Sequence, residues 1–252
     1  MSTHQSRLDL TALRGVPFVN DDFVVSRLAS AAVAVRQYRA QEMKLTGLPG
    51  KTDFVSWLSP DTAVRTRPQA VVVQSREVSR IRMRSVGEAT EYLSGIVPAW
   101  RSLLSLPVRY RLLERSNPAL SASFYLWPQH ILLSDAAFDG QQVLRELLLH
   151  EQCHQWLYLI EELWPLDVPE ARRVTLPSGT SGRAPREVIG AAHVAASTVR
   201  MYRAAGGDCP GAEERIAFFT EYGRGCLVLL NGLDKELTDT GRALTRYLQE
   251  AL

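Results

Sequence analysis

The chain has 252 residues, enough to bury a substantial core in one large domain or two small ones. Apolar residues make up 46% and charged residues 22%, the balance of an ordinary soluble globular protein. The net charge of +2 is too small to indicate a nucleic-acid or membrane-surface partner, and no apolar run is long enough to span a bilayer. We expect a single domain, residues 1–252, without a nucleic-acid or membrane partner.

Cysteine usage and the N-terminus bear on the compartment. The three cysteines, Cys153, Cys209 and Cys226, are widely spaced and form no C-x-x-C pair. This pattern favours a reducing compartment over a disulfide framework. The N-terminal stretch MSTHQSRLDL lacks the charged-then-apolar layout of a secretion signal. We therefore expect a cytoplasmic protein.

Residues 1–120 predict a mostly helical region with two short strands. Apolar residues recur at helical spacing from residue 21 to 41, behind an aspartate that we expect to cap the helix. AVVVQ (70–74) and VSRIRMR (78–84) are typical of strands. Residues 87–115 predict helical structure again, interrupted at a proline.

Arg80, Arg82 and Arg84 alternate with Ile81 and Met83 in the second of these strands. Alternate residues of a strand lie on one face, so three guanidinium groups would line that face. A solvated surface is the ordinary explanation for such a face. The alternative is a docking strip for an acidic peptide, such as the leader segment of a peptide substrate.

Residues 121–252 predict a metal-site region followed by C-terminal helices. SASFYLWPQHILLS (121–134) is typical of one or two strands, and a helix should begin near Asp139. Residues 168–184 predict a loop. Three further helices are expected over residues 185–205, 211–230 and 239–252. The fold class is therefore mainly α with a small β-sheet (α+β), with a central H-E-x-x-H helix packed against a C-terminal helical bundle.

The H-E-x-x-H motif is His150, Glu151 and His154 within LLLHEQCHQWLYLIEE. The two histidines stand at i and i+4, so they project from one face of a helix. Apolar neighbours predict that this face is buried, and two buried imidazoles are costly unless they are bonded or ligated. The motif therefore predicts a metal site with His150 and His154 as ligands.

The third ligand of such a site decides its chemistry. The extended hydrolase form of the motif is absent, because Leu157 replaces its glycine and Ile160 its third histidine. A GTxxD pattern is absent too, because GTSGR ends in Arg183. Carboxylates at Glu161, Glu162 and Glu170 are possible ligands, although the first lies too far along the helix from His150 to share its metal.

The other three of the five histidines are His4, His130 and His193. His4 lies near the N-terminus. His130 precedes a strand, and a structural role is expected for it, with a place near the site as the alternative. His193 stands on a predicted helix among small apolar residues. A lone histidine on such a face is usually a core residue, but a metal site that lacks a ligand makes His193 the best candidate.

Two arginines precede His193. Arg186 lies seven residues before it and thus on roughly the same helical face, and Arg183 is nearby. A guanidinium fork at either position can bind a carboxylate close to the metal. The alternative for each is an ordinary surface arginine at the start of a helix.

The order of these motifs, HEQCHQWLYLIEELWPL, a loop, RAPREVIGAAH and then LTDTGRALTRYL, resembles a known family. It is similar to the HExxH-type, 2-oxoglutarate-dependent peptide β-hydroxylases that act on ribosomally made, modified peptides. The resemblance covers about the last half of the chain, from Ser121 to Leu252. Glu187 and Val194 stand where that family often has a proline and a glycine.

The resemblance implies an iron(II) centre held by His150, His154 and His193, with 2-oxoglutarate and dioxygen as co-substrates. It also implies that one of the two arginines, Arg186 or Arg183, binds the keto acid. The expected reaction is hydroxylation of the β-carbon of a residue in a peptide, a ribosomally synthesised precursor.

Glu151 has a different role in each possible function. In the oxygenase we expect it to orient a metal ligand or the substrate. In the alternative, a zinc-dependent metallohydrolase of the peptidase type, Glu151 would be the general base that activates bound water. A third possibility is a binding protein with a structural or degenerate metal site.

Overall fold

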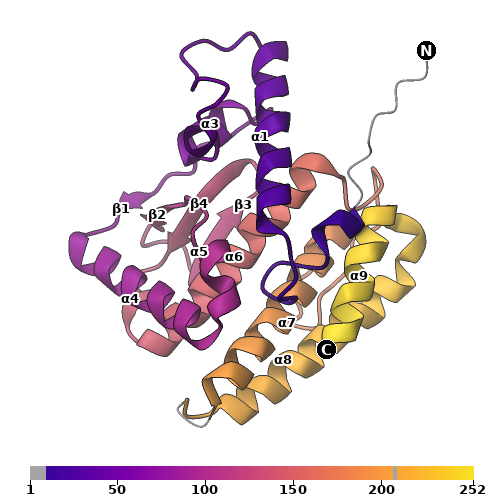
Figure 1. The fold of residues 1–252 in the computed structure, drawn as a ribbon. Helices are drawn as coiled ribbons and strands as arrows, with labels where there is room; N and C mark the ends of the chain where they lie inside the picture. Colours follow the sequence, from indigo (N-terminus) through magenta and orange to yellow (C-terminus); the bar gives the residue numbers. More distant parts are fainter. Residues whose placement is uncertain (1–9, 207–208) are drawn as a thin grey trace.

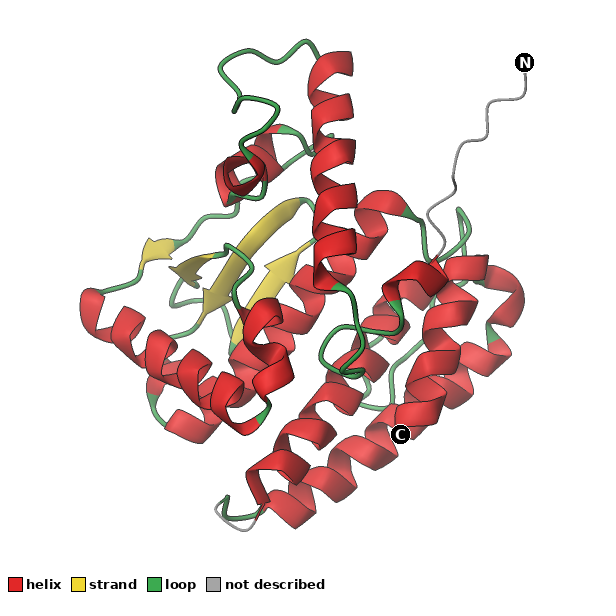
Figure 2. Ribbon diagram, viewed as in Figure 1, coloured by secondary structure: helices red, strands yellow, loops and turns green. Residues whose placement is uncertain are grey.

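The computed structural model describes residues 10–206 and 209–252, so His4 lies outside the described residues. Within them the chain is mainly helical, with one four-stranded sheet (Figures 1 and 2). The predicted α+β class is therefore confirmed. The main hydrophobic core runs from Leu10 near the start to Leu248 in the last helix.

The first half of the described chain contributes five α-helices. They are α1 (Val25–Glu42), α2 (Phe54–Trp57), α3 (Pro60–Arg65), α4 (Arg80–Ile96) and α5 (Arg101–Leu104). Single 3-10 turns occupy Leu10–Leu13, Pro98–Trp100, Ala136–Phe138 and Asp234–Glu236. α1 begins later than predicted and without the aspartate cap, because Val24 is its N-cap and makes no side-chain hydrogen bond.

The predicted strand at residues 78–84 is wrong, since this segment forms the first turns of α4. The Ser79 hydroxyl accepts a hydrogen bond from the backbone N–H of Arg82, which starts a helix there. Ile81 is 77% exposed and so belongs to no buried strand face. The strip of three arginines on one strand face does not exist, because on a helix Arg80 and Arg84 (i and i+4) share one side while Arg82 lies on another.

The other expectations for this half also need correction. Residues 70–74 form no strand, and the first strand is β1 (Arg76–Glu77). Residues 109–112, which were expected to be helical, form β2. Whether such a short segment forms a strand depends on its pairing with neighbouring strands, which the local sequence does not reveal.

The sheet has the order β1-β2-β4-β3. Its later strands are β2 (Arg109–Leu112), β3 (Ser121–Phe124) and β4 (Trp127–Leu133). β4 pairs parallel with β2 and antiparallel with β3, while β1 pairs antiparallel with β2. Every residue of β4 is buried, as expected of a central strand, whereas β3 lies at the edge of the sheet.

The helices of the second half agree closely with the prediction. They are α6 (Gln141–Leu163), α7 (Pro185–Ala205), α8 (Ala212–Gly232) and α9 (Asp239–Ala251). α7 begins with a proline at its first position, which suits a helix start, and Thr238 caps α9 by accepting from the N–H of Gly241. α6 contacts α7 and also both β3 and β4, so it lies between the sheet and the C-terminal helices (Figure 1).

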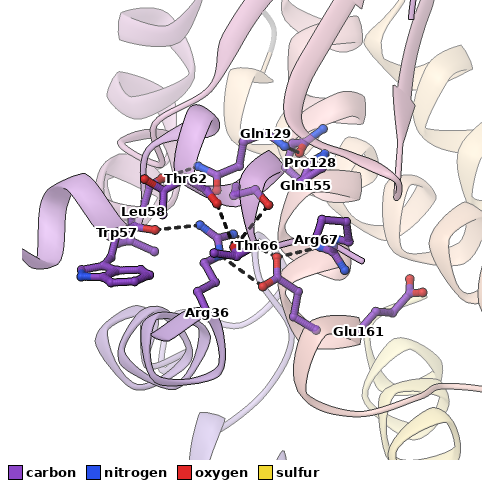
Figure 3. A network of polar contacts seen from close by, with 12 residues as sticks. Arg36, Trp57, Leu58, Thr62, Thr66, Arg67, Pro128, Gln129, Gln155 and Glu161 are labelled. Atoms are coloured by element: carbon purple, nitrogen blue, oxygen red, sulfur yellow. Dashed lines mark hydrogen bonds and ion pairs between the residues drawn. The ribbon is translucent and has the colours of Figure 1, made fainter. Parts of the chain in front are cut away.

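A buried ion-pair cluster ties the end of α6 to the N-terminal helices (Figure 3). Glu162 receives hydrogen bonds from Arg36 on α1, at 2.9 and 3.2 Å, and from Arg67 just after α3, at 2.7 Å. All three side chains are at most 2% exposed. Figure 3 shows the neighbouring Glu161 directed away from this cluster. Glu161 and Glu162 therefore project from different sides of the C-terminal end of α6.

Two further features concern the helices and the cysteines. None of the helices in the described residues is long and apolar enough to cross a membrane. Cys153, Cys209 and Cys226 are all free thiols.

Candidate metal centre

α6 brings the two histidines of the H-E-x-x-H motif together. The Nε2 atoms of His150 and His154 lie 3.1 Å apart. Two nitrogen ligands, each about 2.1 Å from one ion and bonded at nearly a right angle, would stand about 3 Å apart. The pair therefore fits two adjacent positions around a single metal ion.

The surroundings of His154 favour a neutral imidazole. Burial lowers the pKa of His154 well below its usual value, and His150 and His193 lower it further. Tyr158 stacks on the His154 ring, with ring centroids 6.0 Å apart. A neutral ring keeps the lone pair that a metal ligand needs.

His193 lies on α7 and is 1% exposed. Its Nε2 is 2.7 Å from the Pro17 carbonyl, so this nitrogen carries the proton and donates. Its Nδ1 is buried and has no hydrogen-bond partner among the described residues. A metal-bound histidine commonly donates its other ring N–H to a backbone carbonyl in the same way. Burial also lowers the pKa of His193 to about 4, so the ring is neutral at pH 7.

The third ligand is not assembled with the other two. The described residues contain no group of three or more His, Cys, Asp and Glu side chains placed to hold a metal ion together. His193 also does not line the cavity onto which the other two histidines open. The geometry thus joins His150 and His154, and His193 as third ligand stays a prediction.

Glu151 lies beside the histidine pair and is 2% exposed. Its two carboxylate oxygens accept hydrogen bonds from the hydroxyls of Ser121 and Ser123 on β3, at 2.6 and 2.5 Å. Its Oε1 is 3.9 Å from Nε2 of His150. Sequence reasoning missed both serines. Their period-two spacing in SASF, in a strand just before the motif helix, is the signal that could have revealed them.

The histidines open onto a cavity of about 600 Å³. Its lining residues come from β3 and the following turn, from α6, from the loop that precedes α7, from α7 and from α8. The residues that α8 contributes are the aromatic Phe218, Phe219 and Tyr222. The site is therefore a concave pocket, large enough for a small ligand or a peptide side chain.

Both predicted arginines line this cavity. Arg183 donates from Nη1 to Glu187 at 2.7 Å, while its Nε is buried without a hydrogen-bond partner in the described residues. Arg186 already faces two carboxylates, with Asp167 at 3.3 Å and Glu161 at 3.9 Å. Arg183 therefore has fewer carboxylate partners than Arg186, and its guanidinium is more available to an anion that enters the cavity.

Glu161 also lines the cavity. The sequence suggested it only as a possible ligand, too far along the helix from His150 to share its metal. Burial raises the pKa of Glu161 to about 7, while Arg186 lowers it and Asp167 raises it. A carboxyl group that titrates near neutral pH can accept or release a proton at the cavity wall. Only the fold reveals this, because the shift comes mainly from burial.

His130 belongs to another part of the sheet. It is buried and stacks on Trp127, with ring centroids 4.2 Å apart, and it lines a different cavity. Its structural role, which the sequence suggested, agrees with this position.

Compared with protein-family models and with curated proteins, the chain matches none. The chemistry of the site therefore has to be inferred from the residues that line it.

Proposed function

We propose that the protein is an iron(II)- and 2-oxoglutarate-dependent oxygenase that hydroxylates the β-carbon of a residue in a peptide, a ribosomally synthesised modified-peptide precursor. His150 and His154 would hold the metal, with His193 as the third ligand through Nδ1. When bound, iron(II) supplies the chemistry that couples conversion of 2-oxoglutarate and dioxygen to succinate and carbon dioxide with insertion of one oxygen atom into a C–H bond.

The observation that carries this proposal is the pairing of two features in one cavity. Two histidine nitrogens converge 3.1 Å apart, and the same cavity is lined by Arg183, whose buried Nε has no hydrogen-bond partner in the described residues. A keto acid needs both, because its keto and carboxylate oxygens bind the metal while its distal carboxylate needs a fixed cation. Three neutral histidines leave positions free for such a ligand.

Arg183 is the better candidate for the distal carboxylate. Its Nε donor is buried and unused in the described residues, which is costly unless a ligand satisfies it. Arg186 is supported less well, because Asp167 and Glu161 already offset its charge. Binding at Arg183 would compete with a single carboxylate, that of Glu187.

Glu151 would act as a positioning residue. The two seryl hydroxyls occupy both of its oxygens, which fixes the carboxylate beside His150. A negative charge held there stabilises a cation bound to the two histidines. It also ties the metal-bearing helix to β3, the strand that forms one cavity wall.

A zinc-dependent peptidase is the second candidate, and one distance favours it. Oε1 of Glu151 is 3.9 Å from His150 Nε2, so the carboxylate could reach water bound to a metal at the pair. Each oxygen of Glu151 already accepts one serine hydrogen bond, which leaves a single lone pair per oxygen to take a proton.

Two assays on the purified protein separate these functions. Iron(II)-loaded protein is incubated in air with 2-oxoglutarate, and succinate is measured; many such oxygenases turn over slowly without their main substrate. Zinc-loaded protein is incubated with a pool of blocked peptides, and cleavage is measured. Succinate formed by wild type but not by His154→Ala supports the oxygenase. Peptide cleavage that needs Glu151, without succinate, supports the peptidase.

The proposal includes a cytoplasmic site of action and a peptide partner. Free thiols and the lack of a membrane-spanning helix among the described residues are compatible with this compartment. An acidic leader segment is less well supported than the sequence suggested. Arg82 on α4 is already paired with Asp135, at 2.5 Å, and the three arginines share no strand face.

A further inference from the structure

The outer edge of β3 is unpaired along the cavity wall. β4 is the one strand that pairs with β3 in the described sheet, and Figure 2 shows β3 as its outermost arrow on the side of the C-terminal helices. The Leu120 carbonyl accepts from the N–H of Ser134 at 2.8 Å, so Leu120 directs its backbone groups toward β4. In an antiparallel pair this direction alternates, so the backbone N–H and C=O of Ser121 point outward.

Ser123 also directs its backbone outward. Its carbonyl accepts a hydrogen bond from the hydroxyl of Tyr158 on α6, at 3.3 Å, and Ser123 has no partner residue in the register with β4, which is irregular between Ala122 and Phe124. A carbonyl oxygen has two lone pairs, so it can accept a second donor. Ser121 and Ser123 thus present backbone donors and acceptors along the open edge, spaced two residues apart.

This edge lies next to the histidine pair. Ser121 Oγ is 2.6 Å from Glu151 Oε1, which in turn is 3.9 Å from His150 Nε2. Residues 121–125 all line the cavity. A further strand would lie about 4.8 Å outside β3.

We propose that an extended segment of the peptide substrate binds the outer edge of β3 as an added strand, paired with Ser121 and Ser123. This inference rests on the proposed function, which supplies the peptide substrate and the reacting centre at the histidine pair. The recognition comes from backbone hydrogen bonds, which suits an enzyme that must hold a flexible chain in one register.

The pairing also selects the residue that reacts. Residues directly opposite in a strand pair project their side chains to the same face. The side chains of Ser121 and Ser123 reach Glu151 on α6, so their partners in the peptide would also project toward α6. The partner of Ser121 would hold its β-carbon nearest to His150, which makes it the residue modified. The peptide residue between the two would project to the opposite face.

A backbone-methylation scan on the wild-type protein tests this pairing. A pool of seven-residue peptides, acetylated and amidated at their ends, is mixed under nitrogen with the protein, iron(II) and 2-oxoglutarate. Retained peptides are identified by mass spectrometry, and the strongest binder is resynthesised with one N-methyl group at each position in turn. We expect at least tenfold weaker binding at two positions separated by two, and little change between them. The proposal is overturned if no peptide is retained, or if the positions at which N-methylation weakens binding are not separated by two.

A matched pair of variants tests it from the protein side. Ser121→Ala and Ser121→Pro both remove the hydroxyl that binds Glu151, but only the proline removes the backbone N–H. Proline is tolerated at the first residue of an edge strand. The proposal predicts at least tenfold weaker peptide binding by Ser121→Pro than by Ser121→Ala, and equal binding contradicts it. If Ser121→Pro does not fold, the methylation scan decides.

Failure of this proposal can be distinguished from failure of the proposed function. Peptide binding is read without turnover, and succinate formation is read without peptide. If N-methylation weakens binding at every second position but no succinate forms, the edge of β3 would be the peptide site of another class of enzyme. If succinate forms but binding shows no such alternation, only the proposed binding at the β3 edge is rejected.

Discussion

Gly190 on α7 lies against the imidazole of His154. A Cβ atom at Gly190 would stand 3.3 Å from Cε1 and 3.4 Å from Nδ1 of that ring. This is tighter than nine in ten Cβ contacts in proteins, so a side chain at Gly190 would displace the ring by a few tenths of an ångström. With glycine at this position, His154 Nε2 lies 3.1 Å from His150 Nε2.

The variant Gly190→Ala is therefore expected to weaken metal binding about tenfold without unfolding the protein. The added methyl displaces the ring of His154, while alanine favours the helix by about 1 kcal/mol over glycine. Gly87→Ala on α4 is the matched control, since a Cβ there meets nothing within 4 Å. Competition with a chromophoric chelator measures both affinities. Equal affinities for Gly190→Ala and Gly87→Ala would show that Gly190 does not position the ligand.

Removing the Arg183 guanidinium should weaken binding of 2-oxoglutarate. Arg183→Gln removes a buried donor that we assign to the distal carboxylate, and a charge-assisted hydrogen bond is worth about 1.5–3 kcal/mol, or roughly 10- to 100-fold in affinity. Arg173→Gln is the control, because Arg173 also faces Glu187, at 3.7 Å, but is largely exposed and does not line the cavity. Isothermal titration with the metal-loaded protein measures the affinity. A weaker affinity in Arg186→Gln alone would transfer the role to Arg186.

The variant Glu162→Gln should destabilise the protein by about 3–5 kcal/mol. It leaves Arg36 and Arg67 buried without their carboxylate, and breaking a buried pair costs about this much. Glu77→Gln, which removes an 82% exposed partner of Arg111, should cost less than about 1 kcal/mol. Urea unfolding at pH 7 measures both. Similar losses in the two variants would contradict a structural role for the cluster.

The same cluster predicts loss of stability in acid. Burial by itself would raise the pKa of Glu162, but Arg36 and Arg67 outweigh burial and lower it. A lowered folded-state pKa gives stability that is complete above the unfolded-state pKa and is lost as the pH falls through the folded-state value. Acid unfolding of wild type should therefore show this loss below about pH 4.5, and Glu162→Gln should not.

Glu161 should act with the opposite sign. Burial raises the pKa of Glu161 to about 7, so the folded state holds a proton that the unfolded state releases. The stability associated with this proton is present below the unfolded-state pKa and falls as the pH rises toward 7. Glu161→Gln should therefore gain stability relative to wild type between pH 5 and pH 8, by at most about 3 kcal/mol. A difference that does not vary with pH would mean that Glu161 is ionised throughout.

The sequence predicted the second half of the fold well because its signals are local. Pro185 at the first position of α7 and Thr238 as the cap of α9 mark helix starts that the structure keeps. The first half depended on strand pairing, which is not local. Ser79 caps a helix where alternating residues suggested a strand, and β2 lies where a helix was expected.

The candidate site was predictable in part for the same reason. His150 and His154 are related by helix geometry alone, so their convergence follows from the motif. The bonds from Ser121 and Ser123 to Glu151 connect a strand to a helix about thirty residues later; the alternation in SASF indicates that the two serines share a face, but not which residue they contact. The two arginines were found together, but only the fold distinguishes the free donor of Arg183 from the paired Arg186.

The most direct test of the proposed metal centre is an absorbance scan of the protein reconstituted without oxygen with iron(II) and 2-oxoglutarate. We predict a weak visible charge-transfer band in wild type that disappears in His193→Ala and persists in His130→Ala, which removes a buried histidine away from the cavity. Circular dichroism establishes that both variants are folded. No band in wild type, with zinc retained through purification, would contradict the oxygenase and leave Glu151 as the candidate base of a hydrolase.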